Sequence, residues 1–223
     1  MTRLGLVHTV PALAATFDDL VTAAAPVGAE PIHVVDPWLL RTALAGGVTP
    51  EVVDRLAAHV AHLRGRGVAG VLVTCSTLGE ATEQVLDRLG VETPVVRVDQ
   101  AMADRAVELA GDGGRVAVLA TVASTTGPTQ RLVRRSARRA GSTVTVDVEL
   151  LEEAGRARES GAADRHDELV AAAIERWDGR TDVVVLAQAS MAVAAGRAGT
   201  TTTPVLGSPE LAARRLVELT TPV

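Results

Sequence analysis

The sequence contains no lysine, tyrosine or asparagine, and it has one cysteine, one phenylalanine and two tryptophans. Without lysine the chain cannot form a Schiff base, anchor pyridoxal phosphate or complete a Walker A phosphate loop. Without tyrosine it has no phenolic acid or base. The single cysteine, Cys75, cannot close an internal disulfide, and cysteine-rich metal sites are excluded.

Long apolar runs are also missing, so no transmembrane helix is predicted. The first residues loosely imitate a signal peptide, but His8, Thr9 and Pro11 interrupt the apolar stretch. We interpret it as a core strand and expect a cytoplasmic protein with no membrane partner. The net charge of −5 argues against a nucleic-acid partner, because such proteins usually carry a basic surplus.

What is present is an alternation of short Val-rich runs with helical patterns, in a chain that is 47% apolar and 22% charged. Such runs are typical of parallel strands buried on both faces, and the alternation predicts an α/β fold with mostly parallel sheets. The predicted strands are Leu4–His8, Ile32–Val35, Val71–Thr74, Val95–Val98, Val116–Ala120, Val144–Val148, Val183–Ala187 and Val205–Leu206. The predicted helices are Pro50–Gly65, Gln130–Ala140, Asp167–Trp177 and Ser208–Leu219.

The sequence repeats itself. LGLVHTVPA from Leu4 aligns with VAVLATVAS from Val116, and VLVTCSTL from Val71 aligns with VVLAQASM from Val184. The offsets, about 112 and 113 residues, predict two similar α/β halves. We expect residues 1–99 plus about 205–223 to form one half and 100–204 the other, with the ligand at the carboxyl ends of the strands in a cleft between the halves.

Cys75 is the first candidate for chemistry. It follows a predicted strand and precedes a helical pattern, where free N–H groups and the positive helix end favour a thiolate. Ser76 and Thr77 add hydroxyl donors, and the turn also suits a carboxylate. The alternative is a buried structural cysteine, which the polar neighbours oppose.

The repeat supplies the other candidates. Gln188 occupies the place of Cys75 in the second half, and it hydrogen-bonds but does not titrate near neutral pH. Thr9 and Thr121 occupy equivalent positions of the repeat, at the ends of the first strand of each half, and His8 precedes Thr9. The predicted substrate-binding residues are His8, Thr9, Ser76, Thr77, Thr121, Ser124, Ala189 and Ser190.

Three further patterns favour ordinary structural roles. Gly65–Gly70 spells G-x-G-x-x-G, but it ends a predicted helix and enters a strand, so we interpret it as a helix stop. His59 and His62 lie three apart without further zinc ligands. A helix face with five arginines between residues 131 and 139 is typical of a solvated surface, or of a dimer contact with an acidic patch.

The runs LVTCSTLGE and VVVLAQASM, the paired halves and the ending TPVLGSPELA resemble the aspartate/glutamate racemase superfamily over essentially the whole chain. That group includes glutamate, aspartate and hydantoin racemases, maleate isomerase and arylmalonate decarboxylase. The resemblance implies two Rossmann-like halves and cofactor-independent chemistry next to a carboxylate. Racemases of the family use two opposed cysteines. Cys75 matches the first, and the second falls on Gln188.

The resemblance therefore implies an enzyme without cofactor or metal that acts on a small carboxylate substrate, with Cys75 as acid, base or nucleophile. Either Cys75 alone transfers protons in a lyase, decarboxylase or isomerase, or His8 or a water replaces the second base and racemisation survives. The competing classes are a non-catalytic small-carboxylate-binding protein and a redox-sensing thiol protein. A homodimer is compatible with the arginine-rich helix.

Overall fold

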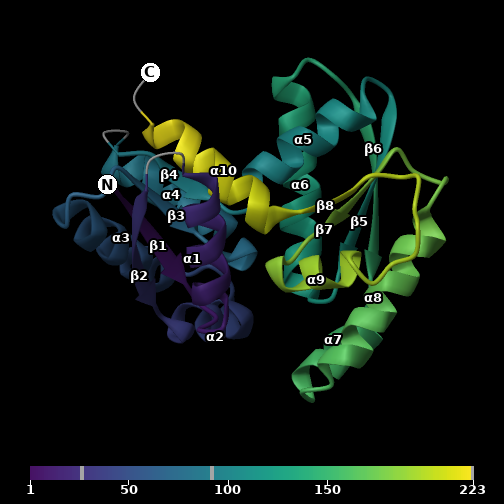
Figure 1. The fold of residues 1–223 in the computed structure, drawn as a ribbon, viewed down its shortest axis with the longest axis horizontal. Coiled ribbons are helices and arrows are strands. Elements are labelled where there is room, and N and C mark those ends of the chain that lie inside the picture. Colours follow the sequence, from purple (N-terminus) through teal and green to yellow (C-terminus); the bar gives the residue numbers. More distant parts are fainter. Residues whose placement is uncertain (26–27, 91–92, 222–223) are drawn as a thin grey trace. The chain divides into compact units, whose positions relative to one another are not determined.

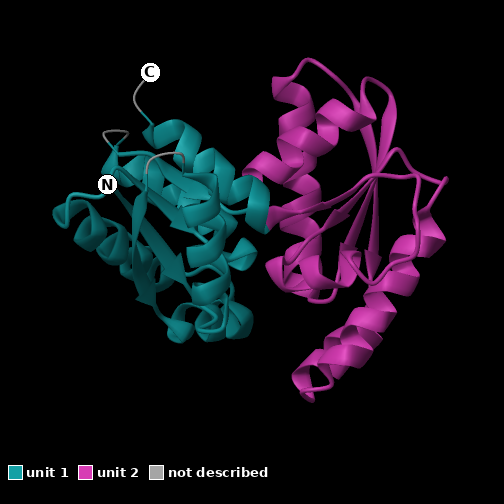
Figure 2. Cartoon of the chain, in the orientation of Figure 1, with its two compact units in different colours: residues 1–98, 209–223 teal, residues 99–208 magenta. Residues whose placement is uncertain are grey.

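The structure is a computed structural model that describes residues 1–25, 28–90 and 93–221 (Figure 1). The chain forms two compact units, one made of Met1–Val98 with Pro209–Val223 and the other of Asp99–Ser208 (Figure 2). Each unit is an α/β sandwich built on its own sheet.

The first unit contains a four-stranded parallel sheet in the order β2-β1-β3-β4. Its strands are β1 (Thr2–His8), β2 (Ala29–Val35), β3 (Gly70–Val73) and β4 (Val95–Arg97). The side chains of β3 are buried throughout, and those of β1 are buried from Leu4 onward, because helices cover both faces of the sheet.

Alternation along the strands sorts the core of the first unit into two layers. Leu4 and Leu6 pack on one face, where α1 and α10 lie, and Val7 packs on the other against α2, α3 and α4. The helices are α1 (Leu13–Ala24), α2 (Pro37–Gly46), α3 (Pro50–Gly65), α4 (Gly79–Leu89) and α10 (Ser208–Thr220). Gly5 lies under Leu63 of α3, where an added Cβ would approach within 3.0 Å. Thr49 and Pro50 begin α3 as its cap and first residue.

The second unit repeats this plan with the parallel order β6-β5-β7-β8. Its strands are β5 (Gly114–Ala120), β6 (Val144–Leu150), β7 (Val183–Leu186) and β8 (Val205–Gly207). Its helices are α5 (Gln100–Ala110), α6 (Ala123–Arg139), α7 (Glu152–Glu159), α8 (Ala163–Trp177) and α9 (Ala192–Ala195). Figure 1 shows β5 to β8 side by side with helices on both sides.

The register confirms the repeat. Leu4 of β1 lies opposite Gly70 of β3, and Val116 of β5 lies opposite Val183 of β7, which reproduces the sequence offsets of about 112 and 113. Two short 3-10 helices follow the matched strands. They are η1 (Ser76–Leu78) after β3 and η2 (Ala189–Met191) after β7.

All eight predicted strands and all four predicted helices are present. The helical pattern expected after Cys75 is α4, and among the described residues five further helices were missed, namely α1, α2, α5, α7 and α9. The first unit resumes at Pro209, slightly later than the expected 205, because β8 pairs with β7 in the second sheet and only the following helix returns. In the described ranges no helix has the length and apolarity needed to cross a membrane.

Candidate functional site

The Cys75 turn lies at the carboxyl edge of the first sheet. Cys75 has extended backbone angles at the N-cap position of η1, directly after β3 and Thr74. Its sulfur accepts hydrogen bonds from the hydroxyl of Thr9, directly after β1, from the hydroxyl and N–H of Thr77, and from the N–H of Leu78. Four donors, from the segment after β1 and from η1, thus converge on one partly buried thiol.

The expected lowering of the Cys75 pKa is wrong. Burial raises the pKa of the thiol above its ordinary value, and the hydrogen bonds from Thr9, Leu78 and Thr77 offset this only in part. Burial penalises the charged form of any acid, and a 3-10 helix of three residues has little dipole to oppose it. The donors around the sulfur are nevertheless groups that stabilise its anion once formed.

His8 is fully buried at the end of β1 and uses both ring nitrogens within the protein. Its Nδ1 lies 3.0 Å from the Thr74 hydroxyl, and its Nε2 lies 2.9 Å from Nδ1 of His33 on β2. Phe17 packs against the ring at 5.9 Å between centroids. Burial, with the charge of His33, lowers the pKa of His8 to about 4, so the ring is neutral near neutral pH.

The network continues beyond the residues that the sequence identified. Nε2 of His33 lies 3.1 Å from Oδ1 of Asp18 on α1, whose carboxylate is half-exposed. Sequence reasoning missed Asp18, His33 and Thr74, because only the register of β2 on β1 brings His33 to the face of His8.

A second polar cluster follows β2. Asp36 is buried, caps α2 through the Trp38 N–H at 3.2 Å, and accepts hydrogen bonds from Arg55 at 2.5 Å and from His59 at 2.6 Å. Burial would raise the pKa of Asp36, but the hydrogen bonds and charges of Arg55 and His59 outweigh it and lower the pKa. His59 is thus a hydrogen-bond partner of Asp36.

In the second unit, Gln188 holds the place that corresponds to Cys75. Its Oε1 accepts hydrogen bonds from the backbone N–H of Thr121 at 2.9 Å and from the Thr121 hydroxyl at 3.2 Å. Its Nε2 donates to the hydroxyl of Thr125, which in turn donates to the carbonyl of Val122. The amide therefore joins the loop after β7 to the loop after β5.

The other predicted site residues differ in how far they are buried. Thr9 and Ser76 of the first unit and Thr121 of the second are buried, and Thr77, Ala189 and Ser190 are partly buried. Ser124 is exposed on the first turn of α6, where Thr125 instead faces Gln188. The structure thus brings Thr9 and Thr77 together with Cys75 in the first unit, and Thr121 together with Gln188 in the second.

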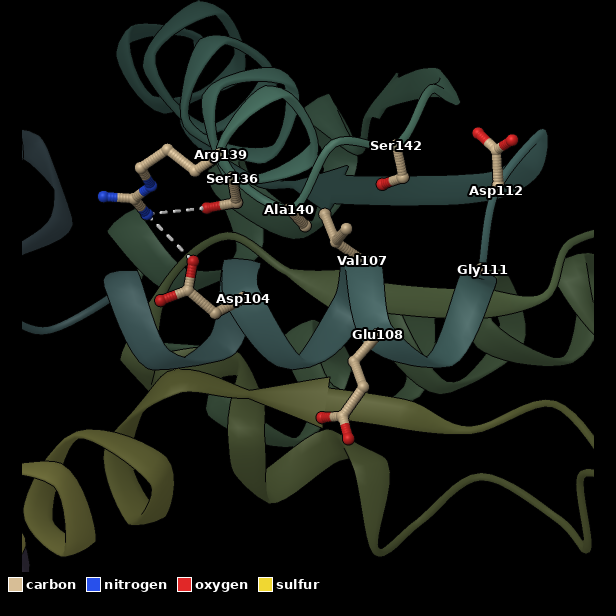
Figure 3. Close-up of a pocket in the computed structure, with 9 residues that line it drawn as sticks. All are labelled: Asp104, Val107, Glu108, Gly111, Asp112, Ser136, Arg139, Ala140 and Ser142. Atoms are coloured by element: carbon tan, nitrogen blue, oxygen red, sulfur yellow. Dashed lines mark hydrogen bonds and ion pairs between the residues drawn. The ribbon is translucent and has the colours of Figure 1, made fainter.

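Figure 3 shows a separate hollow of about 500 Å³ in the second unit, near α5 and α6. It lies at the amino edge of the sheet, because Gly111 and Ser142 precede β5 and β6. Its acids already have partners, including Asp104 with Arg139 at 2.9 Å. A second hollow of about 430 Å³ adjoins α7. Among the described residues, no three His, Cys, Asp or Glu side chains come together as metal ligands.

The Asp/Glu/Hydantoin racemase family model matches residues 9–216, which include both the Cys75 turn and Gln188. The chain belongs to the Asp/Glu/Hydantoin racemase family. No match is found among curated proteins.

Solved structures with the same fold include three from this racemase group. A putative Asp/Glu racemase from Yersinia pestis has a TM-score of 0.71 at 16% identity and covers 98% of each chain. A glutamate racemase from Bacillus anthracis has a TM-score of 0.71 at 15% identity, covering 98% of this chain and 81% of its own. Allantoin racemase from Klebsiella pneumoniae has a TM-score of 0.60 at 18% identity, covering 98% and 87%. At these identities the likeness concerns the fold. This member of the racemase family carries its one cysteine in the first unit.

Proposed function

We propose that the chain is a cofactor-independent enzyme that uses Cys75 alone to transfer a proton at the carbon next to a carboxylate of a small acid. One observation carries this proposal. The thiol has hydrogen-bond donors converging on its sulfur, whereas the corresponding residue of the second unit is a non-titrating amide already bonded to Thr121 and Thr125. General acid–base catalysis needs a group that titrates, and of these two positions only Cys75 provides one.

The raised pKa of Cys75 favours a resting role as proton donor. In a decarboxylase of this kind, the bond from the reacting carbon to one carboxylate of a diacid breaks and CO2 leaves. The resulting enediolate takes the thiol proton on carbon and leaves a thiolate. In an isomerase, the thiolate form first takes the proton of the C–H bond that breaks and then returns a proton to carbon. The N–H groups of Thr77 and Leu78 and the hydroxyl of Thr9 stabilise that thiolate until water returns a proton.

His8 does not supply a second base in this proposal. Both of its ring nitrogens already have protein partners, and its side chain is 0% exposed. We therefore expect one-sided chemistry, such as decarboxylation, elimination, isomerisation or stereospecific exchange, rather than efficient racemisation of aspartate, glutamate or hydantoins.

The test incubates candidate small acids with the protein in heavy water. Proton NMR follows deuterium uptake and new products, and chiral chromatography follows the configuration of the same samples. We expect stereospecific deuterium uptake or product formation that is lost in Cys75→Ala and retained in His62→Gln, an exposed residue on α3. Rapid racemisation by the unmodified protein would contradict the one-base mechanism. Saturable binding without exchange would instead identify a carboxylate-binding protein.

A further inference from the structure

Four side chains of the first unit form a continuous hydrogen-bonded chain that runs from a half-exposed carboxylate to the residue before Cys75. Asp18 on α1 contacts His33 on β2 at 3.1 Å, His33 contacts His8 on β1 at 2.9 Å, and His8 contacts Thr74 at 3.0 Å. Exposure decreases along it, from 50% and 24% for the side chains of Asp18 and His33 to 0% for His8. The chain thus links solvent to the interior of the sheet.

The donor and acceptor roles in this chain depend on one another. An ionised Asp18 only accepts, so Nε2 of His33 carries the hydrogen and Nδ1 of a neutral His33 is an acceptor. Nε2 of His8 must then donate to His33, which leaves Nδ1 of His8 to accept from the Thr74 hydroxyl. One carboxylate at the rim therefore determines the tautomer of a buried imidazole and the direction of a hydroxyl.

Protonation of His33 reverses the two inner hydrogen bonds. The new hydrogen on Nδ1 of His33 faces Nε2 of His8, so the proton of His8 moves to its Nδ1 and is donated to Thr74. The Thr74 hydroxyl then has an acceptor ready, because the carbonyl oxygen of Val7 lies 3.1 Å away. Both arrangements satisfy every polar atom without a change in heavy-atom positions.

We propose that Asp18 and His33 are positioning residues for the Cys75 turn, which hold His8 in its Nε2–H tautomer and change the hydrogen-bond direction at Thr74 when His33 takes up a proton. The functional part of this inference rests on the proposed role of Cys75. The other titratable groups near the chain are few. Among the described residues, His33 has contacts with Asp18 from α1 and His8 from β1, while Cys75 follows the strand on the far side of β1.

The first test reads the tautomers directly and needs no substrate. Two-bond proton–nitrogen NMR spectra of protein labelled with ¹⁵N-histidine distinguish Nε2–H, Nδ1–H and doubly protonated rings among the five histidines. We expect His8 and His33 as Nε2–H tautomers near neutral pH, with His8 passing to Nδ1–H as His33 gains its proton. Asp18→Ala should give a mixture of His8 tautomers. Asp19→Ala, an exposed neighbour on the same helix, should leave the spectrum unchanged. A His8 ring that stays Nδ1–H at every pH overturns the proposal.

The second test asks whether the chain acts on the thiol. The reaction of Cys75 with 2,2′-dithiodipyridine is followed from about pH 5 to 7.5, the range in which histidines ordinarily titrate. We expect the rate to change by about twofold or more across this range, because protonation of His33 reverses the hydrogen bond between His8 and Thr74, the residue before Cys75. The change should vanish in His33→Gln but persist in His62→Gln.

These readouts separate the inference from the proposed function. If no acid is turned over but tautomers and thiol reactivity behave as stated, the proposed function fails and the positioning role stands. If the tautomers behave as stated but the thiol profile of His33→Gln matches that of the unmodified protein, the chain is only structural and the inference is overturned. Where turnover is found, Asp18→Asn should shift the acid limb of kcat with KM nearly unchanged.

Discussion

Gln188 accepts both hydrogen bonds that Thr121 can donate, from its backbone N–H at 2.9 Å and from its hydroxyl at 3.2 Å. In the first unit the Thr9 hydroxyl donates in the same way to Cys75. The repeat has thus preserved a threonine donor at the end of each first strand and changed its acceptor from a sulfur in one unit to an amide oxygen in the other.

Replacing Gln188 tests whether the hydrogen bonds of its amide to Thr121 and Thr125 stabilise the fold. Gln188→Leu leaves the Thr121 N–H without its acceptor, and a buried donor of this kind costs about 1–3 kcal/mol when unpaired. Urea unfolding should show that loss in the free energy of unfolding. Gln84→Leu, on the exposed side of α4, should change it by less than about 0.5 kcal/mol. Equal stability of the two variants would show that the hydrogen bonds of Gln188 do not stabilise the fold.

Gln188→Cys restores a titratable group at the second position. Because the cysteine loses the contacts with Thr121 and Thr125, we expect a less stable protein that gains weak racemisation of an acid which the unmodified protein exchanges on one face only. Chiral chromatography in heavy water measures it. The double variant Gln188→Cys with Cys75→Ala is the control and should lose the gained activity.

Thr9→Val removes a hydroxyl that stabilises the Cys75 thiolate while keeping the size of the side chain. The pKa of Cys75, already raised by burial, should rise further, because the thiolate loses a hydrogen bond that stabilises its charge. The pH dependence of alkylation by iodoacetamide gives the midpoint. Thr121→Val, the matched change in the second unit, should leave it in place. An unaltered midpoint in Thr9→Val would mean that the hydroxyl does not serve the sulfur.

The buried His8 makes stability depend on pH. Its pKa falls from 6.5 in the unfolded chain to about 4 in the folded one, so the unfolded state binds more protons between these values. The contribution is fully present above pH 6.5 and is lost as the pH falls toward 4, with an upper limit of roughly 3 kcal/mol. Urea unfolding across this window should show a shallower pH dependence in His8→Gln than in the unmodified protein, whereas His62→Gln should follow the latter.

Asp36→Ala removes the acceptor shared by Arg55 and His59 and the cap of α2. We expect a loss of about 2–3 kcal/mol in the free energy of unfolding, because a buried acceptor with charged donors contributes more than a surface pair. Asp54→Ala breaks an exposed pair with Arg88 and should cost less than about 1 kcal/mol. The lowered pKa of Asp36 means that its contribution is present above the unfolded pKa of 3.8 and lost in acid.

Much of this architecture could be predicted from the sequence. Strands buried on both faces must be almost wholly apolar, so the runs at Leu4, Val71, Val116 and Val183 predicted the four central strands. The repeat predicted the matching sheets, and the strand-to-helix turn at Cys75 placed the thiol at a carboxyl edge. These features follow from the order of apolar and polar residues along short segments, so they can be predicted before the fold is known.

Tertiary structure alone decided the rest. The register of β2 on β1 puts His33 on the face of His8, and the packing of α1 brings Asp18 to the far side of His33. No spacing in the sequence encodes that contact. Burial likewise reversed the expected pKa shift of Cys75, since the cost of charging a thiol depends on the water that the surrounding elements exclude. The sequence by itself determined which residues can carry protons here. Only the packing of α1, β1 and β2 joined Asp18, His33 and His8 into one hydrogen-bonded chain.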